Sequence, residues 1–156
     1  MKAGNVISHR DHLIYASILF ISLACNPETP SEIFQSSGIA INGYDPVAYF
    51  TEGMPVKGDS LYVFHWKGAV WRFSNDEHLK MFGADPEKYA PQFGGYCAYG
   101  MYEGHKAKTE PDTWTIVDDK LYLNYNMNVR DLWRENRGEH IRIAETNWPE
   151  VKNQEF

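Results

Sequence analysis

The hydrophobic and polar positions divide the chain into three parts. Residues 13–24 form an uninterrupted apolar run, and residues 26–37 are polar and rich in Pro and Ser. After them, short apolar runs alternate with turn-forming residues, which is the pattern of a packed domain. The pattern predicts one domain over residues 38–150, preceded by a flexible tether over residues 25–37 and followed by a tail over residues 151–156.

Two β-hairpins are predicted within this domain. The aromatic and β-branched runs 61–66 and 69–74 are separated by Lys67-Gly68, a pair that favours a tight turn. The runs 114–117 and 120–124 flank Asp118-Asp119 in the same way. In the second hairpin, the alternation of a strand places Leu121 and Leu123 on one face and Tyr122 on the other.

Short helices are predicted between and after the hairpins. Asp45 and Pro46 can start a helical turn, and Asn75 can cap a helix over residues 76–82. A turn from Pro86, a helix after Asn128 and a last helix before Pro149 follow, together with a short β-like stretch over residues 39–44 and a buried Gly-rich turn leading into a short helix over residues 93–100. This mixture predicts a small α+β domain in which two antiparallel hairpins pack with short helices.

The N-terminal residues have the layout of a signal peptide. Lys2 and Arg10 precede the apolar run 13–24, which is too short to span a bilayer as a helix. The small residues before Cys25 resemble the lipobox at which bacterial lipoproteins are cut and diacylated, although Ser22 stands where that pattern prefers Leu. We therefore expect residues 1–24 to be a signal peptide and Cys25 to carry a lipid. The protein would then lie on the periplasmic side of a bacterial cell envelope.

Composition and charge narrow the class of partner. Hydrophobic residues make up 43% of the chain and aromatic residues 15%, which is enough to form a core. The net charge is −6, and no cluster of Lys and Arg is present to bind phosphates. Nucleic acid is therefore not an expected partner. The membrane, reached through the lipid, and an envelope protein remain.

The central motifs resemble the YHS domain family. The resemblance covers residues 43–91, and two later segments, 94–99 and 119–125, look like the extension of exported stand-alone members. It rests on three motifs, Asp45-Pro46-Val47, the hairpin Trp66–Ser74, and the segment Phe82–Tyr89 with its Asp-Pro-Glu-Lys-Tyr. The family implies a YHS-like core, here followed by a C-terminal helical extension.

The family's metal site does not carry over to this chain. Metal-associated members have cysteines at two places that here hold Ala48 and Ser74. A substitute site for copper or zinc would have to use Cys97, His105 and His65, because soft thiolate and imidazole ligands suit these metals. Cys97 with His65 and Asp45 would alternatively provide a nucleophile, a base and a group to orient the base.

The expected function is that of an exported, non-enzymatic binding module that handles a metal or binds an envelope partner. One alternative is a thiol-dependent redox protein or enzyme that uses Cys97, which requires an exposed thiol with a lowered pKa. Another is a structural envelope protein without a small ligand. The sequence names no reaction.

Overall fold

The computed structural model describes Met1 and residues 30–156. The predicted signal peptide and Cys25 lie outside these residues. The described part is a small mixed domain with two sheets and six α-helices, so the predicted α+β class is confirmed. None of the helices in residues 30–156 has the length and apolar character needed to cross a membrane.

The first hairpin belongs to a larger sheet than the sequence predicts. Its strands β3 (Asp59–Trp66) and β4 (Ala69–Phe73) pair antiparallel, and the sheet order is β1-β2-β4-β3. The added strands are β1 (Gln35–Ser36) and β2 (Ile39–Ala40), and β2 runs parallel to β4. The β-like stretch predicted over residues 39–44 stops at Ala40, because Ile41 and Asn42 adopt positive φ angles in a short 3-10 turn, η1 (Ile41–Gly43).

The turn of this hairpin has the chemistry predicted for it. Lys67 and Gly68 have φ angles of 47° and 74°, as a two-residue turn that matches the twist of the strands requires. The register pairs Val63 with Arg72 and His65 with Val70. These four side chains therefore share the outer face of the sheet, and the inner face carries the large aromatic residues.

The inner face of the sheet builds the first core. Trp71, Phe73 and Phe82 are completely buried, and Phe82 comes from α2 (Asp76–Ala84), which packs against the sheet. Asn75 caps α2, as predicted, because its side chain accepts a hydrogen bond from the His78 backbone N–H. The short helices α1 (Ala48–Thr51) and α3 (Pro86–Tyr89) complete this region.

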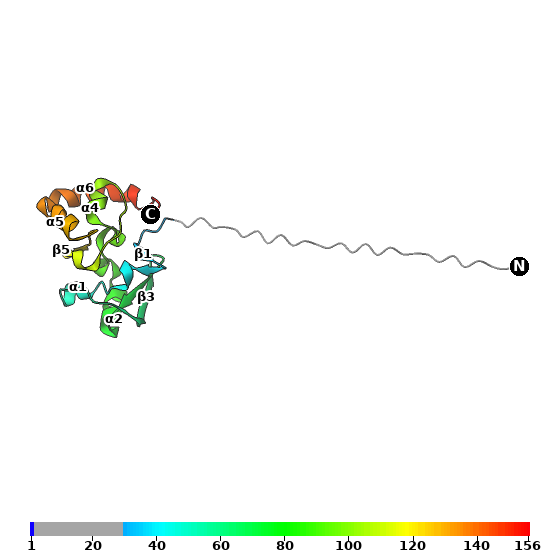
Figure 1. Cartoon of the computed structure of the whole chain (residues 1–156). Coiled ribbons are helices and arrows are strands. Elements are labelled where there is room, and N and C mark those ends of the chain that lie inside the picture. Colours follow the sequence, from blue (N-terminus) through cyan, green and yellow to red (C-terminus); the bar gives the residue numbers. More distant parts are fainter. Residues whose placement is uncertain (2–29) are drawn as a thin grey trace.

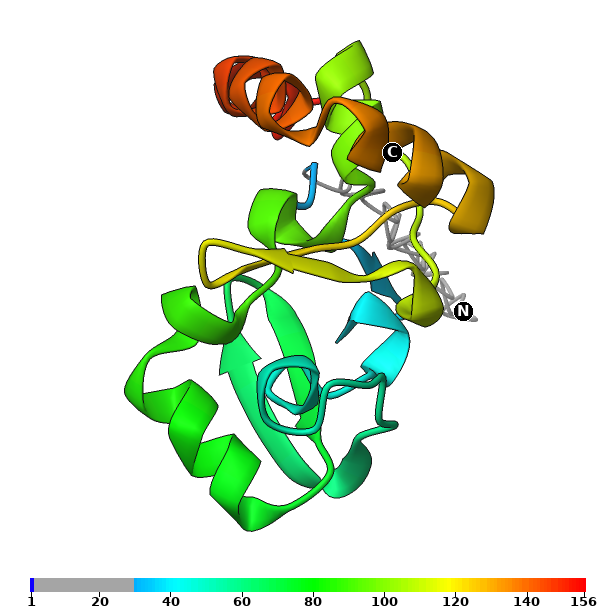
Figure 2. The same cartoon turned by 90° about the vertical axis from the view of Figure 1, so that its left-hand side faces the viewer.

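The second hairpin separates the first core from a second one. In β6 (Lys120–Tyr122) and the residue after it, Leu121 and Leu123 join the first core, whereas Tyr122 joins the second, which confirms the predicted alternation. β6 pairs with β5 (Thr115–Val117), which follows the short turn η3 (Pro111–Thr113). Figure 2 shows this yellow hairpin between the helices above it and the green sheet below.

Three helices cover the far side of the second core. They are α4 (Ala98–Glu103), α5 (Met127–Glu135) and α6 (Arg137–Val151). Trp133 of α5 is completely buried in the second core. Asn126, not Asn128, caps α5, since the Asn126 side chain accepts from the Val129 backbone N–H. Helix α6 also continues past Pro149 to Val151 instead of ending before the proline.

The packed domain extends beyond both predicted boundaries. Ile33 and Phe34 are buried although the sequence places them in the tether, and Val151 is buried at the start of the predicted tail. The two ends meet at Lys106, whose ammonium donates to the backbone carbonyls of Ser31, Lys152 and Gln154 at 2.9, 2.9 and 2.6 Å. Burial lowers the pKa of Lys106, and these three carbonyls are the hydrogen-bond acceptors of its ammonium.

Candidate functional site

The structure does not bring the three predicted metal ligands together. Cys97 is buried with 1% exposure in the second core region, and His65 is exposed on the outer face of β3. His105 is exposed in the loop after α4. Among the described residues, no three His, Cys, Asp or Glu side chains are grouped so that they could hold a metal ion. Copper or zinc binding by Cys97, His105 and His65 therefore has no formed site in this structure.

Cys97 has the surroundings of a structural thiol. It caps α4, where its sulfur accepts from the Gly100 backbone N–H at 3.4 Å, and its S–H points to the Asn124 side-chain oxygen at 3.7 Å. Burial raises the pKa of Cys97, against the effect of its backbone hydrogen bonds. A thiol-dependent enzyme needs an accessible thiol with a lowered pKa, and this cysteine has neither property.

We expect iodoacetamide to alkylate Cys97 at least about a hundredfold more slowly in the native protein than in urea, because the thiol is buried and protonated. Mass spectrometry of samples quenched over time measures both rates. Ser60→Cys in a Cys97→Ala background is the matched control, because Ser60 is exposed on β3, and its thiol should react rapidly in the native state. Equal rates for Cys97 in the native and unfolded chains would contradict this assignment.

A buried network around Asp45 is the densest polar cluster that the sequence did not reveal. The Asp45 carboxylate is completely buried, and its Oδ2 atom lies 2.7 Å from the His78 Nδ1 atom. The same oxygen accepts from the backbone N–H and hydroxyl of Ser74, both at 2.8 Å. Its Oδ1 atom accepts from the backbone N–H groups of Val47 and Ala48. The carboxylate therefore joins β4, α2 and the start of α1.

His78 is the residue of this network that sequence reasoning missed. Its Nδ1–H donates to Asp45, and its Nε2 atom faces the Thr51 hydroxyl at 3.1 Å. The sequence suggested His65 as the histidine beside Asp45, but His65 lies exposed on β3, on the outer face of the sheet. The sequence does place His78 in the first turn of a helix, three residues after the predicted Asn75 cap. The partner of that imidazole is a tertiary contact that no local pattern specifies.

A cleft lies where the β3–β4 turn meets the second core region. Three hollows on the described surface share Lys67 in their lining. The most enclosed of them has a volume of about 110 Å³. We call this hollow the Lys67 cleft, and the polar and aromatic side chains that line it are Glu32, Trp66, Lys67, Glu87, Gln92, Phe93 and Trp148. These residues come from segments far apart in the sequence.

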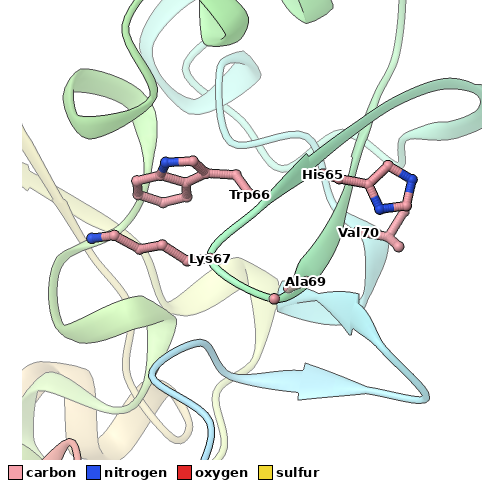
Figure 3. Close-up of a pocket in the computed structure, with 6 residues that line it drawn as sticks. His65, Trp66, Lys67, Ala69 and Val70 are labelled. Atoms are coloured by element: carbon pink, nitrogen blue, oxygen red, sulfur yellow. The ribbon is translucent and has the colours of Figure 1, made fainter.

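Lys67 is held by charge and by an aromatic ring. Its ammonium lies 3.0 Å from a Glu87 carboxylate oxygen, 3.3 Å from a Glu32 oxygen and 4.4 Å from the centroid of the Trp66 ring. Figure 3 shows the Lys67 side chain beside the Trp66 ring, whereas His65 points to the other side of the strand. Burial alone would lower the pKa of Lys67, but the two carboxylates outweigh burial and raise it.

The wall of the cleft is an unusual stretch of backbone. Phe93, Gly94 and Gly95 in the turn η2 (Gln92–Gly95) have φ angles of 56°, 62° and 88°. This run lets the backbone approach the N-terminal segment closely, and the Phe34 N–H donates to the Gly94 carbonyl at 2.9 Å. The contact fixes the segment that carries Glu32 against the segment that carries Gln92. One wall of the cleft is therefore joined to the N-terminal segment by a backbone hydrogen bond.

Comparison with protein-family models, with curated proteins and with solved structures gave no match to this chain. The resemblance to the YHS domain family therefore stays a prediction from the motifs, and the fold and the cleft are interpreted on their own geometry.

Proposed function

We propose that this protein is an exported, lipid-anchored binding module of the bacterial cell envelope, and that a protein partner occupies the Lys67 cleft. The observation that carries the proposal is the convergence of carboxylates, an ammonium, an amide and two indole rings on one small hollow. Such groups recognise a ligand through charge, hydrogen bonds and aromatic contact. Trp is also among the residues that contribute most of the binding energy at protein interfaces.

The position of the cleft agrees with an anchored module. Ser31 and Glu32, which lie within the predicted tether, line a hollow beside Lys67. At ~3.5 Å per residue, the stretch from Cys25 to Glu32 reaches at most about 25 Å. A lipid on Cys25 would therefore keep the cleft close to the bilayer, where the partner would be an envelope protein. Fractionation of a Cys25→Ser variant tests this part, since loss of the lipid should release the protein from the membrane.

Site-specific photocrosslinking in intact cells tests the binding site. A photoreactive amino acid at Gln92, inside the cleft, should give a crosslinked product that mass spectrometry identifies, and Glu87→Lys should reduce that product strongly. The same amino acid at Leu132, exposed on α5, is the control. A product at Leu132 but none at Gln92 would overturn the proposed site.

A further inference from the structure

The Lys67 cleft already contains the kind of ligand that its walls attract. Glu32 and Glu87 both pair with the Lys67 ammonium, which also lies over the Trp66 ring. Carboxylates and an indole face are the groups that recognise an ammonium in proteins. The chain therefore shows, with its own side chain, that this arrangement accepts a primary ammonium.

The charge in the cleft is not balanced. Two carboxylates face a single ammonium, so one negative charge is left over beside a hollow of about 110 Å³. Trp148 and the Gln92 amide line the same hollow and are half-buried. A second cation of modest size would therefore find a carboxylate, an amide acceptor and a second indole ring. A metal ion is a poorer fit, since no third acidic, His or Cys side chain joins the two carboxylates among the described residues.

We infer that the Lys67 cleft binds a lysine ammonium of the partner protein, between the Glu32 and Glu87 carboxylates and the indole rings of Trp66 and Trp148. This inference rests on the proposed function and adds the chemistry of the partner to it. A lysine suits the hollow because its slender stem can enter where a bulkier group would not. Lys67 then competes with the partner for the same two carboxylates.

Because Lys67 competes for the two carboxylates, removing its ammonium should strengthen the binding of another ammonium. Binding is measured by titrating residues 26–156, which contain both cores. The probes are Nα-acetyl-lysinamide and butylammonium, with butanol as the uncharged control. The readout is the indole N–H signals of Trp66 and Trp148 in ¹H–¹⁵N spectra. Saturable shifts are expected in the millimolar range, as for an exposed charged site, and they should weaken as salt is added.

Two variants and a control separate this chemistry from unspecific binding. Lys67→Met should tighten binding of both probes by about threefold or more, because it frees two carboxylates, and Glu87→Gln should weaken it by about threefold. Lys108→Met, which removes an exposed lysine beside Tyr125 outside the cleft, should change nothing. Near-ultraviolet circular dichroism checks that each variant is folded.

The relative binding of the two probes tests whether the ligand is a lysine side chain, whereas the crosslink at Gln92 tests whether a partner occupies the cleft. Tighter binding of Nα-acetyl-lysinamide than of butylammonium supports a lysine of a protein, and equal binding would point to a free amine instead and overturn the lysine assignment. No saturable shift with either probe, in the unchanged chain and in Lys67→Met, overturns the ammonium chemistry. In that case a crosslink at Gln92 would still support a partner at the cleft.

Discussion

Gly94→Ala is expected to destabilise the domain by at least about 3 kcal/mol, because the new methyl group has no space. A Cβ at this position would lie 1.8 Å from the Glu32 carbonyl oxygen, and Gly94 has a φ angle of +62°. The backbone cannot simply move away, since the Gly94 carbonyl accepts from the Phe34 N–H. Urea denaturation followed by tryptophan fluorescence measures the loss in the free energy of unfolding.

Gly38→Ala is the matched control for this prediction. Gly38 also has a positive φ angle, +78°, but nothing lies within 4 Å of an added Cβ. Only the backbone cost of the left-handed conformation remains, about 1 to 2 kcal/mol. The difference between the two variants therefore isolates the steric contact between the N-terminal segment and the cleft wall. Equal losses for Gly38→Ala and Gly94→Ala would show that the segment holding Glu32 is not packed as described.

Asp45→Asn is expected to cost about 3 to 5 kcal/mol, because it leaves buried donors without their carboxylate. The amide can replace one oxygen of Asp45, but its NH₂ group then faces donors, either the two backbone N–H groups at Oδ1 or Ser74 and His78 at Oδ2. Thermal and urea unfolding of the variant measure the change, and the histidine ring signals of His78 report whether the network has opened.

An exposed aspartate provides the comparison for Asp45→Asn. Asp59 accepts a backbone hydrogen bond from the Leu61 N–H at 2.9 Å at the surface of the same domain. Asp59→Asn should cost less than about 1 kcal/mol, because water can satisfy the groups it leaves. If Asp45→Asn cost no more than Asp59→Asn, the Asp45 network would not support the junction of β4, α1 and α2.

The parts of the fold that the sequence predicts correctly depend on neighbouring residues. The Lys67-Gly68 turn requires positive φ angles that this pair tolerates, and the strand alternation alone places Leu121 and Tyr122 on opposite faces. The predicted position of the α5 cap, Asn128, is wrong by two residues. Asn126 and Asn128 carry the same side chain, and in the structure it is the Asn126 side chain that accepts from the Val129 N–H and begins the helix.

The parts that the sequence does not predict depend on contacts between distant segments. The parallel pairing of β2 with β4 places Ile39 beside Val70, and a two-residue strand has no pattern of its own. Phe34 stands in a segment that is mostly polar and rich in Pro and Ser, so the sequence predicts it in the tether, yet it packs in the second core. The sequence also does not predict the Lys67 cleft, because Glu32 and Glu87 are far apart along the chain and become neighbours only after folding.

The junction at Lys106 means that the order of the segments along the chain is not what holds the fold together. One nitrogen contacts carbonyls of Ser31 and of Gln154, so the first and last packed residues are adjacent in space. A short linker could join them, and new ends could be opened at the exposed Asp118-Asp119 turn. Such a circular permutant would keep both cores and would move the chain end that is predicted to carry the lipid from the cleft to the turn of the β5–β6 hairpin.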